Sequence, residues 1–159
     1  MTAVDQAAWL DSLPPTVVRP ADRPVAVDGV LAGLPVPEGL DREGLAMSGI
    51  VGEPHDVEGD VTNALVCAWI QQWVDGTEVG DAAAVADAVD AMASSRQWPV
   101  LVANDGTWAH HIWQVADAMV ADVPLDPYTG IPQGTGYQRS VDCAEGSGGA
   151  ARSGAGQID

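Results

Sequence analysis

The stretch between residues 61 and 74 constrains the fold of this chain more than any other part of the sequence. Its apolar residues recur at the spacing of one helix face: Val61, Leu65, Val66, Trp69, Ile70 and Trp73. This period predicts a helix with a broad apolar face, which other elements must cover to keep it from water. We therefore expect a packed helical domain.

Two more stretches of helical period follow, separated by residues that end helices. The sequence predicts helices over about residues 60–76, 81–98 and 107–122. Asp60 and Thr107 are expected to cap the first and third, and Asp81 opens the second. No run alternates long enough to form a sheet, and no β-α-β pattern is present. The predicted fold class is all-α, a small three-helix bundle core with short accessory helices.

The parts outside these three helices are expected to be less regular. Prolines recur from Pro14 to Gly39, which predicts an extended arm of polyproline character lying across the bundle, with a short edge strand over Val25–Leu31 as the alternative. Asp41 can cap a short helix over 42–48. Residues 50–59 are predicted as a loop, residues 100–102 as a connector and residues 124–143 as an irregular excursion.

These patterns divide the chain into three parts. Residues 1–40 comprise an N-terminal helix over 2–13 and the Pro-rich extended arm, and residues 41–143 form the helical domain. Residues 144–159 are rich in Gly, Ser and Ala and are expected to be a flexible tail. The size of 159 residues suits one domain with flexible ends.

The chain is strongly acidic, with a net charge of −17, six basic residues that are all Arg, and 17 Asp against 6 Glu. The arginines are scattered and form no basic stripe, so direct nucleic-acid binding is not expected. Three explanations of the acidity stay open: the composition of a GC-rich genome, solubility at high salt, and a functional acidic face toward a basic partner.

Cys67 and Cys143 are the two cysteines, and they allow one disulfide between the first bundle helix and the C-terminal segment. The alternative is that Cys67 is a small buried residue with no partner. No apolar run approaches the roughly 20 residues that span a bilayer. Residues 1–20 lack the features of a signal peptide. We expect a soluble protein without membrane insertion, and the compartment stays open.

No motif of known catalytic chemistry stands out. His110 and His111 are adjacent, so their side chains point about 100° apart on a helix and do not hold one metal ion. His55 lies in an acidic loop with Glu53, Asp56, Glu58 and Asp60, but the spacing does not match a calcium loop. The segment 134–136 lacks the lysine of a phosphate loop. No metal or cofactor is therefore expected.

The tryptophans indicate a core and a contact surface. We expect the core to centre on Trp69, Trp73, Trp98, Trp108 and Trp113. Trp108 and Trp113 point to different sides of the third helix, so one of them is the best candidate for an exposed contact, together with His110 and His111.

The leading functional hypothesis is a non-catalytic interaction or assembly module that docks a protein partner, with a homo-oligomer or a larger assembly left open. The absence of catalytic groupings, the surplus of tryptophan and the long arm support it. One alternative is an acidic decoy that mimics nucleic acid and binds a basic protein. Another is a metal-dependent enzyme that uses the His55 loop.

Overall fold

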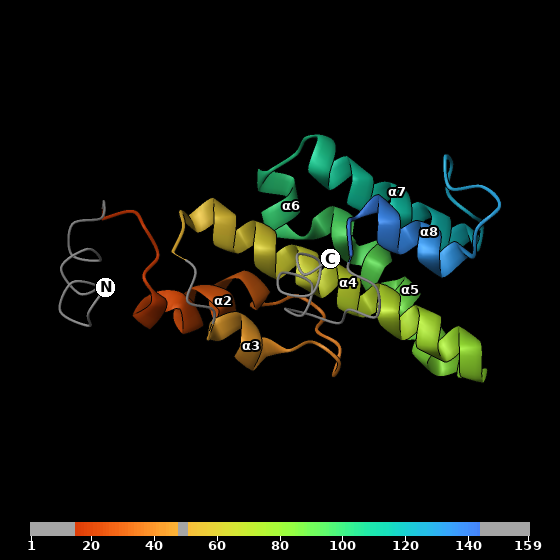
Figure 1. Cartoon of the computed structure of the whole chain (residues 1–159), viewed down its shortest axis with the longest axis horizontal. Coiled ribbons are helices and arrows are strands. Elements are labelled where there is room, and N and C mark those ends of the chain that lie inside the picture. The colour runs from red at the N-terminus through yellow and green to blue at the C-terminus, as the bar shows by residue number, and fades with distance from the viewer. Residues whose placement is uncertain (1–14, 48–50, 144–159) are drawn as a thin grey trace, which may run out of the picture.

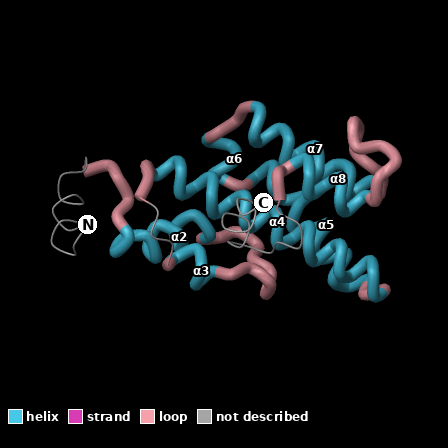
Figure 2. Tube along the Cα trace, in the orientation of Figure 1, coloured by secondary structure: helices cyan, strands magenta, loops and turns pink. Residues whose placement is uncertain are grey.

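The computed structural model describes residues 15–47 and 51–143, and within these ranges the fold is all-α, as predicted (Figures 1 and 2). The predicted N-terminal helix over 2–13 and the predicted tail over 144–159 lie outside the described residues. The helical elements are, in order, η1 (Pro20–Asp22), α2 (Arg23–Leu31), α3 (Arg42–Ala46), α4 (Pro54–Val79), α5 (Ala82–Ala93), η2 (Ser94–Gln97), α6 (Pro99–Ala103), α7 (Thr107–Ala121) and α8 (Gln133–Ser140).

Helix α4 runs through the middle of the molecule, and α2, α5 and α8 pack against it (Figure 1). α5 folds back along α4, α7 lies against α5, α2 covers another side of α4, and α8 rests on both α4 and α7. The apolar face predicted on the first bundle helix is buried, as expected for a helix enclosed by neighbours. Its buried members are Val61, Leu65, Val66, Trp69, Ile70 and Trp73.

The start of α4 differs from the sequence prediction. The predicted loop over 50–59 is wrong for residues 54–59, and so is the predicted cap at Asp60, because α4 already begins at Pro54. Glu53 caps it in a capping box, in which the Glu53 side chain accepts from the third helical N–H and Asp56 accepts from the Glu53 N–H at 3.0 Å. Proline suits a first helical position because its missing N–H is not needed there.

The end of α4 also lies beyond the predicted stop at Gly76. Gly76 is buried inside the helix, and a Cβ there would lie 3.0 Å from Val85 Cγ2 and 3.2 Å from Asp81 O. Glycine therefore serves close helix packing at this position. The true stop is Gly80, whose φ of 75° is left-handed and suits glycine. Asp81 then caps α5 by accepting from the Ala84 N–H at 3.1 Å.

The Pro-rich arm is only partly extended. The extended prediction and the alternative strand over Val25–Leu31 are wrong for η1 and α2, which start at Pro20 and Arg23. Pro20 and Pro24 stand in the first turns of these helices, where proline is tolerated, so they do not interrupt them. Residues 32–41 have no helix, and the arm lies on the bundle: Trp69 Nε1 donates to Pro35 O at 3.0 Å.

Arg23 anchors α2 to its neighbours from a buried position. It is 3% exposed, and its Nε donates to Leu45 O at 2.6 Å. Its Nη2 lies 3.8 Å from Asp60 Oδ2 on α4. A buried guanidinium requires such partners, because an unpaired buried charge is strongly unfavourable. One side chain thus joins α2 to α3 and to α4.

Three details in the second half of the chain also correct the prediction. The connector over 100–102 is part of the short helix α6. Thr107 is the first residue of α7, not its cap, and Gly106 precedes it without a side-chain cap. Part of the predicted irregular excursion over 124–143 is the helix α8. The short helix predicted after Asp41 is present as α3, and Asp41 accepts from the Gly44 N–H at 2.8 Å.

Candidate functional site

The two candidate contact tryptophans on α7 have different surroundings. Trp113 is half-buried, and its Nε1 donates to Ser95 O at 3.1 Å. The Arg96 guanidinium lies 5.5 Å from the Trp113 ring, and the His110 ring lies 5.2 Å from it. Trp113 is therefore engaged within the fold. The side chain of His110 pairs with Asp105, with Nε2 2.8 Å from Oδ1.

Trp108 instead borders a cavity of about 440 Å³, which we call the Trp108 pocket. The pocket lies between α4, the start of α7 and the end of α8, and its lining includes Asp60, Asn63, His111, Ser140 and Asp142. Trp108 is half-buried, and no indole hydrogen bond joins it to the described residues, unlike those of Trp69, Trp98 and Trp113. The structure therefore brings Trp108 and His111 together and leaves Trp113 and His110 elsewhere.

His55 does not lie in a loop. It stands in the first turn of α4, where its exposed Nε2 is 3.3 Å from Asp56 Oδ1. The residues described contain no group of three or more His, Cys, Asp or Glu side chains placed to hold a metal ion.

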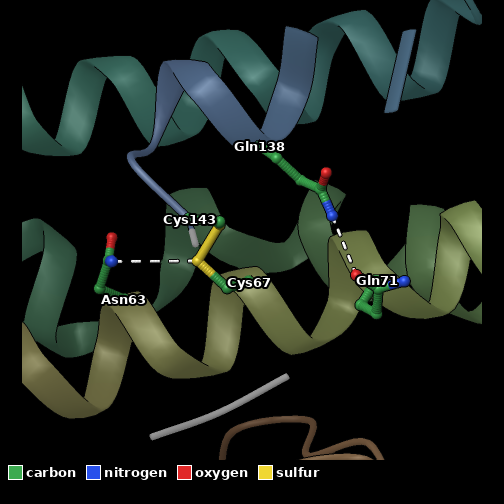
Figure 3. Close-up of a disulfide and its surroundings, with 5 residues drawn as sticks. All are labelled: Asn63, Cys67, Gln71, Gln138 and Cys143. Atoms are coloured by element: carbon green, nitrogen blue, oxygen red, sulfur yellow. Dashed lines mark hydrogen bonds between the residues drawn. A yellow bond between two sulfur atoms is a disulfide. The ribbon is translucent and has the colours of Figure 1, made fainter. Parts of the chain in front are cut away.

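A disulfide joins Cys67 in the middle of α4 to Cys143 just after α8 (Figure 3). The sulfur atoms are 1.97 Å apart, and the cysteines are 76 residues apart in the sequence. Asn63 Nδ2 lies 3.9 Å from Cys67 Sγ, and Gln138 Nε2 donates to Gln71 Oε1 at 3.0 Å, so α8 is tied to α4 along one face (Figure 3).

An apolar groove of about 650 Å³ lies at the other end of α4. We call it the valine groove. It lies between the α4–α5 turn on one side and the end of α7 with the start of α8 on the other. The α4–α5 turn and α8 are at the right of Figure 1. Trp73 from α4, Val85 and Val89 from α5, and Met119 and Val120 from α7 supply its apolar surface.

Carboxylates edge this groove. Asp90 and Asp122 are among its lining residues, and Gln133 from α8 is the amide there. Its lining, as far as the chain is described, includes no Arg or His side chain. The groove therefore combines an apolar surface with a negative edge.

Tyr137 of α8 packs against Trp73, one of the residues that line the groove. Its ring meets Trp73 edge to face, with centroids 5.2 Å apart, and its hydroxyl donates to Val123 O at 2.7 Å. Burial raises the pKa of the Tyr137 phenol above its ordinary value of 10.0; a hydrogen bond from Gln133 opposes the rise, and the nearby charge of Asp122 adds to it. The phenol therefore stays neutral and remains a donor at neutral pH.

Sequence reasoning missed the valine groove because the ends of four helices form it. Two of its sides depend on the continuation of α4 past Gly76 and on α8, and neither was predicted. The cluster of valines at 79, 85, 89, 120 and 123 was the available signal.

Comparison of the chain with models of protein families, with curated proteins and with solved structures found no match. None of the described helices combines the length and the apolar character needed to cross a membrane.

Proposed function

We propose that the protein is a non-catalytic docking module whose valine groove receives an amphipathic helix with basic flanks from a partner protein. The observation that carries this proposal is the combination of an open apolar groove with carboxylates at its edge. Recognition of an amphipathic helix in an apolar groove is a common mode, in which residues one turn apart on the ligand helix fill the groove.

Exposed valines stand among or next to the groove residues in the chain, which favours a macromolecular partner over a small ligand. Val120 lines the groove and is 57% exposed, and Val79, next to the lining residue Gly80, is 78% exposed. Val123 follows the lining residue Asp122 and is 44% exposed. Neighbouring exposed apolar side chains of this kind mark interaction surfaces.

The charge of the groove favours a basic partner over a second copy of this chain. Asp90 and Asp122 edge the groove, and the whole chain carries a net charge of −17. A second copy would bring carboxylates toward carboxylates, which is unfavourable. Lys and Arg flanking an apolar stripe would instead meet opposite charge and associate faster.

Titration with a synthetic amphipathic peptide of leucine and lysine tests the proposal, with binding followed by calorimetry at physiological salt. Val120→Lys and Val79→Lys should each weaken binding by about tenfold or more, because they place a cation in the apolar contact. Two valines of matched exposure serve as controls: Val102 on α6, 55% exposed, and Val25 on α2, 77% exposed.

Val102→Lys and Val25→Lys change the net charge by the same amount as the two groove variants, which makes them matched controls. If the groove is the site, each control should alter the affinity by less than about twofold. Equal weakening by all four variants would show general attraction between charged molecules and would refute the groove as the docking site. A wild-type chain that binds the peptide no better than a scrambled peptide of the same composition would also refute it.

A further inference from the structure

We propose that the Cys67–Cys143 disulfide is a redox latch, which a dithiol opens through the Trp108 pocket and which controls the valine groove by holding α8 in place. The part of this inference that concerns docking rests on the proposed function, whereas the opening of the latch does not.

Helix α8 depends on contacts with the rest of the fold. It has 8 residues, two of which are glycine, and an isolated helix of this length is not stable in water. Tyr137 is its one large buried side chain, and the disulfide fixes the chain just beyond its last turn. Breaking the bond therefore removes the covalent restraint from an element with weak intrinsic stability.

The same helix shapes the valine groove. Gln133 in its first turn lines the groove, and Tyr137 packs against the groove residue Trp73. A Cβ on Gly134 would lie 2.4 Å from Val74 Cγ2, so α8 sits directly on α4 at this point. If α8 leaves, Trp73 loses its ring partner and the groove loses one side.

The Trp108 pocket is lined by neighbours of the two cysteines, and a reductant would approach the bond from this side. Its lining includes Asn63, which contacts Cys67 Sγ, and Asp142, which precedes Cys143. Cys67 is fully buried, whereas Cys143 is partly exposed, so attack on Cys143 Sγ is favoured. The indole of Trp108 supplies an apolar wall beside this approach.

The exchange follows ordinary thiol–disulfide chemistry. A thiolate of the dithiol bonds to Cys143 Sγ, the bond between the two cysteines breaks, and its electron pair goes to Cys67 Sγ. Asn63 Nδ2, 3.9 Å from that sulfur, donates to the departing thiolate (Figure 3). The second thiolate of the reductant then displaces Cys143. The chain gains two thiols with protons from water, and the reductant becomes a disulfide.

Hydrogen exchange on the full chain, with and without dithiothreitol, tests the latch. Reduction should speed amide exchange over residues 133–141 by about tenfold or more and leave α5 protected, since α5 packs along both α4 and α7. The variant with Cys67→Ser and Cys143→Ser should show the same pattern without reductant. Affinity for the leucine–lysine peptide should fall by about tenfold in parallel.

Each alternative outcome identifies which step is wrong. Protection of α8 after complete reduction would overturn the latch, and so would equally fast exchange throughout α5, because the bond would then hold the whole fold. Release of α8 with unchanged peptide affinity would overturn its link to the groove. If the oxidised chain does not bind the peptide, the docking function is refuted, and the control of docking with it. The exchange data still decide whether the latch opens.

The role of Asn63 has its own test. Asn63→Leu should slow reduction by dithiothreitol by roughly threefold to tenfold, as expected for the loss of one hydrogen bond to a thiolate. Gln71→Leu on the same helix is the control, because it removes the bond to Gln138 but not a contact with sulfur. An unchanged rate for Asn63→Leu would show that Asn63 does not assist the departing thiolate.

Discussion

Replacement of Trp69 by alanine is the sharpest test of how the core is built. Trp69 is 7% exposed, and its Nε1 donates to Pro35 O at 3.0 Å, so the residue both fills the core and holds residues 32–41 on α4. A tryptophan buries about 150–250 Å². At about 25 cal/mol per Å² this area is worth about 4–6 kcal/mol. Measured truncations of large buried aromatics lie near 3–5 kcal/mol.

We expect Trp69→Ala to lower the free energy of unfolding by about 3–5 kcal/mol, which is a large part of the stability of a typical domain. Urea melts followed by far-ultraviolet circular dichroism, with the disulfide intact, measure this difference. Trp108→Ala is the control, because Trp108 is half-buried and has no indole hydrogen bond to the described residues. Trp108→Ala should lower the free energy of unfolding by only about 1–2 kcal/mol. Equal losses for the two variants would refute the assignment of Trp69 to the core.

Five further substitutions test three other features of the fold by the same urea melts. Gly134→Ala should destabilise the fold by about 1–2 kcal/mol, because the added Cβ would lie 2.4 Å from Val74 Cγ2. Gly59→Ala in α4 should stabilise it by about 0.5–1 kcal/mol, because an added Cβ there has no neighbour within 4 Å. The raised pKa of Tyr137 means that the unfolded chain loses the phenol proton first. Stability should therefore be unaffected by this group below pH 10 and fall as the pH rises above it, and Tyr137→Phe should remove this dependence on pH. Arg23→Met should lower the free energy of unfolding by about 1–3 kcal/mol, because it removes the hydrogen bond to Leu45 O. The Arg42 side chain is 51% exposed and pairs with Asp28, so Arg42→Met should lower it by less than about 1 kcal/mol.

The apolar face of α4 was predictable because periodicity is strong when large side chains recur on one side of a helix. The all-α class follows from the same signal. The start of α4 and the helix α2 were missed because Pro20, Pro24 and Pro54 were interpreted as breaks. Proline breaks a helix interior but fits its first turn, and only the backbone shows which position it occupies.

Helix α8 and the valine groove were missed for a different reason. The sequence of α8 has weak helix propensity, and its stability comes from Tyr137, Gly134 and the bond at Cys143. These contacts join residues far apart in the chain, so no local pattern reports them. The groove likewise appears only when the ends of several helices meet.

The position of α2 and residues 32–41 on α4 has a practical consequence for any shortened version of the protein. Val27 and Leu31 are buried, and Trp69 is covered in part by the segment that contains Pro35. A truncation that starts at Asp41 would expose apolar side chains of α4 to solvent. Such a fragment should precipitate or self-associate during purification, so expression work needs the residues from Pro15 onward.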